Sequence, residues 1–198
     1  MPVRITTLSE DTAGRSKLLA ERGLSILVET ENTSVLLDTG NSVSVAHNAD
    51  ALGINLSKID RIVLSHGHYD HTGGLRQVLH KMRKDIEIIA HPDIWQPKYA
   101  RRKNEPDRYI GIPFQRNELE SLGAYFNLTT EAVKIDDYIT TTGEIPMVTS
   151  FEQVDADLFV KNGASWQPDK IMDDQALIVD TEYGLVVILG CAQFIQAL

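Results

Sequence analysis

The sequence has one cysteine and no long apolar run, and both shortages exclude classes of protein. Cys191 is the only cysteine among 198 residues, which excludes an internal disulfide and favours a reducing compartment. No stretch approaches the roughly 18 consecutive apolar residues of a membrane-spanning helix. The first residues also lack the apolar block of a signal peptide. We therefore expect a cytoplasmic protein that does not associate with membranes.

Positive charge is also scarce. The chain has 19 Lys and Arg residues against 28 Asp and Glu residues, which gives a formal net charge of −9. This charge repels a phosphate backbone, so nucleic acid is disfavoured as a partner and nuclease as an activity. The one dense basic run, residues 98–103, is typical of a solvated loop or helix face. The alternative is that this run receives an anionic group of a substrate.

The hydrophobic pattern predicts one α/β domain over residues 1–198. Helices are expected at residues 42–52, with Ser42 as the cap, and at 75–84 and 117–122. Residues 93–117 lack a clean periodicity and are expected to form a long loop or lid. Strands are expected at residues 3–8, 23–30, 34–38, 60–65, 87–90, 125–129, 132–135, 138–141, 175–181 and 185–189. This order indicates two packed sheets flanked by helices rather than a doubly wound parallel sheet.

Four potential metal ligands occupy the six positions from 66 to 71. His66, His68, Asp70 and His71 follow an apolar, β-branched run directly, so a strand delivers them into a glycine-containing turn. Imidazole and carboxylate groups both suit zinc and related divalent ions, and such a turn can aim them into one pocket. Histidines in polar loops are often only solvated turn residues. The spacing, followed by Thr-Gly-Gly, favours metal binding, with zinc preferred over iron or manganese.

Four further residues are candidates for contacts with the substrate or the metal. His91 precedes a proline at a strand end, where it either joins the same rim or simply closes the strand. Asp173 and Asp174 precede the last hairpin and Cys191 follows it, so these side chains can approach a shared site. Cys191 is either a thiolate ligand or a buried structural thiol.

Two segments carry a resemblance to a known family. Residues 36–40 (LLDTG) and 64–75 (LSHGHYDHTGGL) resemble the metallo-β-lactamase superfamily, whose signature is His-x-His-x-Asp-His after a strand. Residues 91–92, 173–177 and 184–192 resemble its dihydropterin ribofuranosylaminobenzene phosphate synthase-like branch, which is linked to pterin synthesis. The resemblance implies an αββα sandwich that holds one or two metal ions at one edge, between the two sheets.

The resemblance also implies roles for individual residues. His66 and His68 would bind the first ion, and Asp70 and His71 the second. Asp38 would orient the histidines, since a carboxylate that holds one imidazole nitrogen fixes the direction of the other. Asp70 would be the catalytic residue that holds or deprotonates the attacking water.

The sequence departs from the branch in two places. Gln193 stands where the branch usually has a histidine ligand, and an amide oxygen is a poor substitute for imidazole at zinc. The sequence also ends at Leu198, before the family's final strand and helix segments and a late histidine. We therefore expect a domain that is incomplete at its C-terminus, in a shortened product or in a natural variant that closes its sheet by forming a homodimer.

Two functions follow from these observations. The first is a metal-dependent hydrolase that acts on a phosphorylated or pterin-like small molecule. The second is a truncated, catalytically impaired relative that binds metal or ligand without turnover.

Overall fold

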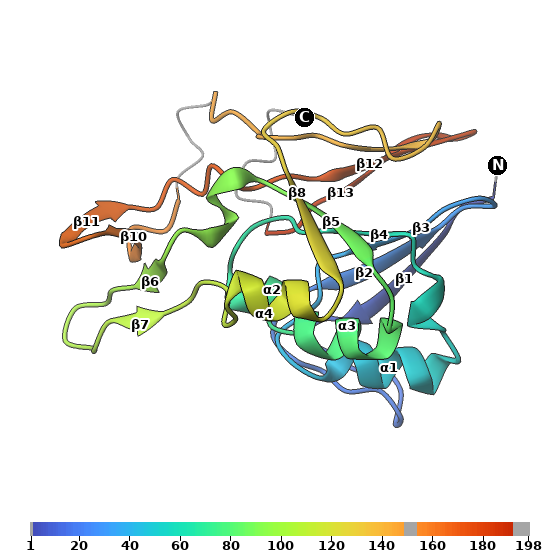
Figure 1. Cartoon of the computed structure of the whole chain (residues 1–198), viewed down its shortest axis with the longest axis horizontal. Coiled ribbons are helices and arrows are strands. Elements are labelled where there is room, and N and C mark those ends of the chain that lie inside the picture. Colours follow the sequence, from blue (N-terminus) through green and yellow to red (C-terminus); the bar gives the residue numbers. More distant parts are fainter. Residues whose placement is uncertain (1, 149–153, 192–198) are drawn as a thin grey trace.

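A six-stranded mixed sheet forms the centre of the protein in this computed structural model, which describes residues 2–148 and 154–191 (Figure 1). Its strands are β1 (Arg4–Ser9), β2 (Ser25–Glu29), β3 (Ser34–Leu37), β4 (Arg61–Val63), β5 (Ile86–Ala90) and β8 (Ala124–Leu128), in the order β1-β2-β3-β4-β5-β8. The β1–β2 and β2–β3 pairs are antiparallel, and the remaining neighbours are parallel. The carboxyl ends of β3, β4 and β5 therefore meet at one edge of the sheet.

Helices cover one face of this sheet, as Figure 1 shows. They are α1 (Ser44–Leu52), α3 (Leu75–Met82) and α4 (Arg116–Ser121), with short 3-10 turns η1 (Leu56–Lys58) and η2 (Pro92–Trp95). Successive side chains of a strand point to opposite faces. Leu36, Ile62 and Ile88 accordingly pack in the core beneath the helices. Their neighbours Val35, Leu37, Val63 and Ile89 pack in a second core on the opposite face.

A three-stranded sheet closes that second core. Its order is β13-β12-β9, from β13 (Gly184–Ile188), β12 (Leu177–Thr181) and β9 (Ile139–Thr141). Both neighbouring pairs are antiparallel, which confirms the predicted C-terminal hairpin. Ile139, Leu177, Val179 and Ile188 face the six-stranded sheet and are buried. The prediction of two packed sheets is confirmed, and among residues 2–148 and 154–191 the helices α1, α3 and α4 all pack on one side of them.

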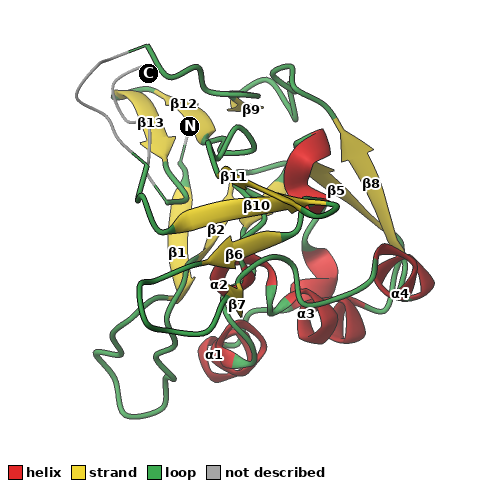
Figure 2. Ribbon diagram, turned by 90° about the vertical axis from the view of Figure 1, so that its left-hand side faces the viewer, coloured by secondary structure: helices red, strands yellow, loops and turns green. Residues whose placement is uncertain are grey.

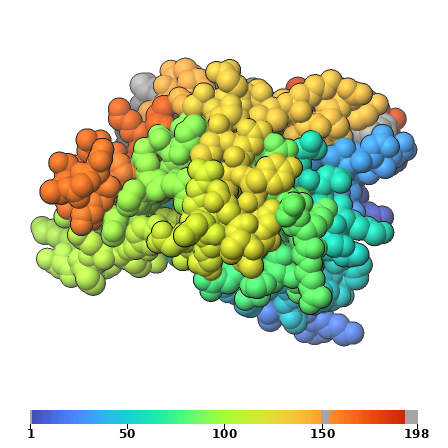
Figure 3. Space-filling view, in the orientation of Figure 1, coloured from blue at the N-terminus to red at the C-terminus, as the bar shows by residue number. Residues whose placement is uncertain are grey.

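The prediction of a long loop at residues 93–117 is wrong. This segment contains β6 (Lys98–Ala100) and β7 (Arg108–Tyr109), which join β10 (Leu158–Asn162) and β11 (Ser165–Pro168) in a four-stranded antiparallel sheet (Figure 2). In the space-filling view, this sheet forms a lobe at one end of the molecule (Figure 3). The local sequence shows no signal because the strands are very short and β6 pairs with a partner far along the chain.

Two further local predictions are wrong. Residues 132–135 form no strand, although Lys134 makes an isolated bridge with Thr140. Ser42 does not cap α1; instead, the carboxylate of Glu21 accepts hydrogen bonds from the backbone N–H groups of residues 42–44. A carboxylate at a helix N-terminus satisfies the free N–H groups and complements the helix dipole. No helix among the described residues is long and apolar enough to cross a bilayer.

Candidate metal centre

The predicted ligand residues lie where β4 leaves the six-stranded sheet. The chain passes through residues 64–68 and enters the short helix α2 (Tyr69–Thr72), so that His66, His68 and His71 are all buried. We call residues 65–71 the ligand loop. Gly67 lies so close to the Ile94 carbonyl oxygen that a Cβ atom would approach it to 2.4 Å. A side chain at position 67, between the two histidines, would therefore clash with this carbonyl.

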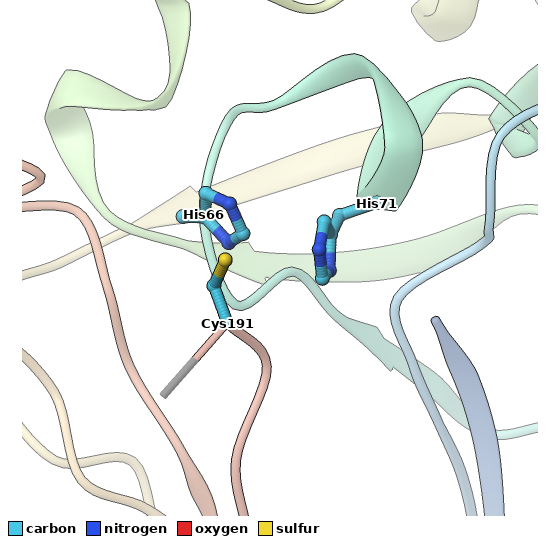
Figure 4. Close-up of side chains that lie close together, drawn as sticks. All are labelled: His66, His71 and Cys191. Carbon is cyan, nitrogen blue, oxygen red and sulfur yellow. The ribbon is translucent and has the colours of Figure 1, made fainter. Parts of the chain in front are cut away.

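The ligand atoms of three side chains converge (Figure 4). His66 and His71 each offer a nitrogen, and Cys191 offers its sulfur, all within 4.8 Å of one another. The His66 and His71 ring centroids are 4.3 Å apart. The path of the chain before Cys191 also needs a glycine, because a Cβ atom on Gly190 would lie 2.1 Å from the Ser65 hydroxyl oxygen.

His68 lies in close contact with His66. His66 Nε2 and His68 Nδ1 are 2.9 Å apart, and their ring centroids are 4.5 Å apart. Two nitrogen ligands on a tetrahedral zinc ion lie about 3.3 Å apart, since zinc–nitrogen distances are about 2.0–2.1 Å. The two imidazoles therefore present their nitrogens with nearly the spacing of metal ligands, and the donor set fits a divalent ion.

Asp38 contacts both Ser65 and His71 in the ligand loop. Its Oδ1 accepts a hydrogen bond from the Ser65 backbone N–H at 2.7 Å, and its Oδ2 accepts one from the Ser65 hydroxyl at 2.6 Å. The same Oδ2 lies 2.7 Å from His71 Nδ1. We call Asp38, Ser65, His66 and His71 the Asp38 cluster.

The Asp38 cluster determines which nitrogens face the site. The Ser65 hydroxyl gives its only hydrogen to Asp38, so its oxygen accepts from His66 Nδ1, which lies 2.9 Å away. His66 Nε2 is then left with its lone pair. His71 Nδ1 is likewise held by Asp38, which leaves its Nε2 for the site. A carboxylate that fixes the tautomer in this way is a common support for metal-binding histidines.

The three histidines differ in protonation. Burial, together with the neighbouring positive groups, lowers the pKa of His66 well below its usual value. Burial also lowers the pKa of His68 to about 4. Burial opposes charge on His71 as well, but the charge and hydrogen bond of Asp38, with a contact to the Cys191 thiol, raise the pKa of His71 to about 10. His71 is therefore protonated near neutral pH without metal, and a metal ion must displace that proton.

The remaining predicted residues lie near this cluster or apart from it. Asp70 is half-buried and its carboxylate is 3.5 Å from the guanidinium of Arg22. His91 uses Nε2 toward Glu144 at 3.1 Å, while its Nδ1 accepts from the Asp93 backbone N–H. Asp70 and His91 are both outside the group formed by His66, His71 and Cys191 among the described residues.

The acidic pair before β12 supports the ligand loop. Asp173 accepts a hydrogen bond from the Gly67 backbone N–H at 2.8 Å. Asp174 is buried beside it, and its backbone N–H bonds to the Ile171 carbonyl. Gln175 donates from its backbone to the Ser65 carbonyl and from its side chain to the Leu64 carbonyl. The segment 173–175 thus holds the ligand loop along its length. Gln193 lies outside the described residues.

Sequence reasoning missed two charged residues near the site. The sequence pattern predicts that Lys98 belongs to a solvated basic run, but Lys98 is buried in β6 and its ammonium group pairs with Asp169 and Asp173. Asp169 carries no sequence signal at all. A buried lysine is rare unless it is paired, and its partners here lie more than 70 residues away along the chain, so only the folded structure brings them together.

The sequence matches the family model of the metallo-beta-lactamase superfamily over residues 19–194. Together with the α/β architecture and the histidine cluster, this match shows that the chain belongs to the metallo-β-lactamase superfamily, and it confirms the resemblance. The matched range extends across Gln193.

Individual relatives narrow the position of the chain within the superfamily. It is 31% identical over 202 residues to 7,8-dihydropterin-6-methyl-4-(beta-D-ribofuranosyl)-aminobenzene-5'-phosphate synthase of Methanocaldococcus jannaschii, covering 96% of this chain and 68% of that protein. An uncharacterized protein of the same archaeon is 33% identical over 183 residues, covering 92% of this chain and 67% of that protein. The chain therefore spans about two thirds of the length of these relatives.

Solved structures agree with this placement. Tm1679, described as a metal-dependent hydrolase of the beta-lactamase superfamily, superimposes with a TM-score of 0.81 at 29% identity, covering 99% of this chain and 69% of that one. A quorum-quenching N-acyl homoserine lactone lactonase shares the fold alone, with a TM-score of 0.50 and 16% identity over 83% of this chain and 58% of that one. The protein has the α/β metallo-β-lactamase fold, in a chain shorter than its relatives.

Proposed function

We propose that the protein is a metal-dependent hydrolase that acts on a phosphorylated or pterin-like small molecule. One observation carries this proposal: His66 Nε2 and His68 Nδ1 face each other at 2.9 Å beside His71 and Cys191, and all three histidines are buried after a strand end. Zinc is the preferred ion, with iron or manganese as alternatives, in one or two copies. A bound divalent ion would supply Lewis acidity to the reaction.

The chain's own residues prepare this chemistry. The Asp38 cluster holds Nδ1 of His66 and Nδ1 of His71, so that the Nε2 atoms of both rings face the site without reorientation of the rings. Asp70 is the catalytic candidate that holds or deprotonates the attacking water. Its carboxylate lies 3.5 Å from the guanidinium of Arg22, and its side chain is 16% exposed. Burial of the three histidines keeps bulk water away from the ligand atoms.

The substrate class rests on the relatives. Tm1679 is described as a metal-dependent hydrolase, and the 31% identical protein is a synthase whose named product carries a phosphate and a pterin. Arg102 and Arg108 line a pocket of about 630 Å³ together with Arg22, close to Asp70. Guanidinium groups suit an anionic group of such a substrate.

A second candidate is a relative that binds metal or ligand with impaired turnover. Gln193 favours it, because glutamine stands where the branch has a histidine ligand. A second copy of the chain in a homodimer is one source of the ligand that Gln193 replaces.

Metal content and turnover test both candidates. The protein is purified without chelator, its metal is measured by elemental analysis, and hydrolysis is assayed with phosphoesters, cyclic phosphodiesters and pterin phosphates. We expect about one or two ions per chain, and almost none in the double variant His66→Ala/His68→Ala. His47→Ala is the matched control, since His47 lies on α1 and bonds to the Lys17 carbonyl.

The outcomes separate the candidates. Metal with hydrolysis that His66→Ala/His68→Ala abolishes supports the hydrolase. Metal without hydrolysis of any of these substrates supports the impaired relative. Equal metal content in the double variant and in His47→Ala contradicts both.

A further inference from the structure

A buried lysine and two buried carboxylates form a charged cluster beside the ligand loop. Lys98 Nζ lies 3.0 Å from Asp169 Oδ2 and 2.9 Å from Asp173 Oδ1. The side chains of all three residues are at most 3% exposed. We call them the Lys98 cluster. Their formal charges sum to −1, which is costly to bury without further partners.

Both carboxylates also face the ligand loop, Asp173 with its second oxygen and Asp169 with the same oxygen that binds Lys98. Asp173 Oδ2 accepts the Gly67 backbone N–H at 2.8 Å, between the two histidines of the motif. Asp169 Oδ2 faces His68 Nε2 at 3.9 Å. The Lys98 cluster is therefore not a separate ion pair, since it touches the ligand loop at two neighbouring positions.

His68 Nε2 is the atom that needs such a partner. It is buried and has no hydrogen-bond partner in the structure. When His68 Nδ1 directs its lone pair at an ion, the proton of the neutral imidazole must be on Nε2. A buried N–H group without an acceptor costs free energy. Asp169 Oδ2 is the carboxylate oxygen that faces this nitrogen.

Asp169 is held rigidly enough to serve as that acceptor. Its Oδ1 accepts the Ile171 backbone N–H at 2.8 Å, and Lys98 binds its Oδ2. A carboxylate oxygen has two lone pairs, so Oδ2 can accept from Lys98 and from His68 together. The ammonium group of Lys98 also offsets the repulsion between the two carboxylates, which lets both remain buried beside the loop.

We propose that Lys98, Asp169 and Asp173 are positioning residues that aim His68 at the metal ion, with Asp169 accepting the Nε2 proton of His68 and Asp173 fixing Gly67. This inference rests on the proposed metal site. His68 thereby receives the same kind of support that Asp38 gives to His71. The supporting residues, Lys98, Asp169 and Asp173, all lie outside the sequence motif. Lys98 acts through the two carboxylates, to which its ammonium group is paired.

Zinc affinity in a double-mutant cycle tests the role of Asp169. Zinc dissociation constants are measured by competition with chelators of graded strength for the wild type, Asp169→Asn, His68→Ala and the double variant. Asp169→Asn should weaken zinc binding about 10–100-fold. In the His68→Ala background the same substitution should change affinity less than about twofold, because its effect passes through His68. Asp60→Asn is the matched control, since Asp60 accepts from the Ser34 backbone N–H at the opposite strand ends.

A measurement on the unmodified protein covers the case in which Asp169→Asn does not fold. Imidazole 15N–1H correlation spectra of the zinc-loaded wild type identify the protonated nitrogen of each histidine. We expect His68 to carry its proton on Nε2, in slow exchange with water. A proton on Nδ1 of His68 overturns the inference.

The outcomes distinguish this inference from the proposed function. Wild type that binds no metal removes the proposed function and the inference with it. Wild type that binds zinc, with Asp169→Asn affinity unchanged or lowered equally in the presence and absence of His68, overturns the inference alone. A loss confined to proteins that retain His68, with Asp60→Asn unaffected, supports it.

Discussion

The ligand loop is supported by two carboxylate clusters that are built in different ways. In the Asp38 cluster, one carboxylate receives three short contacts, from the Ser65 backbone, the Ser65 hydroxyl and His71. In the Lys98 cluster, two carboxylates share one buried ammonium group and reach the loop at Gly67 and toward His68. The first cluster needs no lysine, because its hydrogen-bond donors and His71 balance a single negative charge.

This difference shows which support is local in sequence and which is not. Asp38 directly follows β3 and Ser65 lies two residues after β4, so the parallel pairing of these strands brings the two residues together. Lys98 comes from β6 of the four-stranded sheet, whereas its partners precede β12 of the three-stranded sheet. The Lys98 cluster therefore ties two separate sheets to the ligand loop.

Of these substitutions, the replacement of Lys98 should lower the free energy of unfolding most. Lys98→Met leaves two buried carboxylates without their cation, so we expect the free energy of unfolding to fall by about 3–5 kcal/mol. The difference in the free energy of unfolding between Lys98→Met and the wild type should shrink as pH falls. Burial already raises the pKa of Asp173, and neutral carboxyl groups are less costly to bury than charged ones. Denaturant unfolding at several pH values measures both effects. Arg61→Met is the control, because the partly exposed Arg61–Glu87 pair should contribute about 0–1 kcal/mol. Equal losses in the two variants contradict the comparison.

Neutralising Asp38 should lower the free energy of unfolding less than replacing Lys98 does, and it should also weaken metal binding. Asp38→Asn weakens the bond to His71, and we expect a loss of about 2–3 kcal/mol in unfolding free energy and about a 10–100-fold weaker zinc affinity. Asparagine tolerates the positive φ of 57° at this position, so the substitution isolates the charge from the backbone strain. Chemical denaturation and zinc competition measure the two losses. Unchanged zinc affinity contradicts the role of Asp38.

The pH profile of the metal-free protein sharpens the comparison. The pKa of His71 is raised to about 10. Its contribution to the free energy of unfolding is therefore fully present below the unfolded pKa of 6.5 and is lost as pH rises to about 10. The free energy of unfolding should therefore fall by about 1.4 kcal/mol per pH unit in this window. Asp38→Asn should flatten this slope, because it removes the partner that favours the charged imidazole. Unfolding in the presence of chelator measures the slope, and an identical slope in Asp38→Asn contradicts the assignment.

Below pH 6.5 the free energy of unfolding should depend on pH in the opposite direction. The pKa values of His66 and His68 are lowered, the latter to about 4, because both imidazoles are buried. The unfolded chain binds protons at these residues below pH 6.5 while the folded protein does not, so stability should also fall as pH drops from 6.5 toward 4. We therefore expect maximal stability of the metal-free protein near pH 6.5.

The smallest effect is expected on the four-stranded sheet, outside both clusters. Arg101 lies 4.1 Å from the centre of the Trp166 ring and pairs with Asp107 at 2.9 Å. Arg101→Met should lower the free energy of unfolding by about 0.5–1 kcal/mol and leave zinc affinity unchanged. Calorimetric titration with phosphorylated ligands checks the other interpretation of residues 98–103. Weaker ligand binding in this variant would assign Arg101 to the substrate site.

The sequence by itself determined the family, the central strands and the histidine cluster. Continuous apolar runs specify central strands that are buried on both faces, and His66 to His71 occupy one turn whose glycine lies against the Ile94 carbonyl. The role of Asp38 beside the histidines was implied by the family resemblance of residues 36–40. All these signals are local, or come from the pairing of adjacent strands.

Only the tertiary structure decided the four-stranded sheet, the capping of α1 by Glu21 and the Lys98 cluster. These features join residues from distant segments, and none of them produces a periodicity or a spacing in the chain. A charged side chain such as Lys98 has the sequence pattern of a solvated residue whether it faces water or two carboxylates. Its role is fixed by which partners the fold buries with it, since desolvation makes that pairing obligatory.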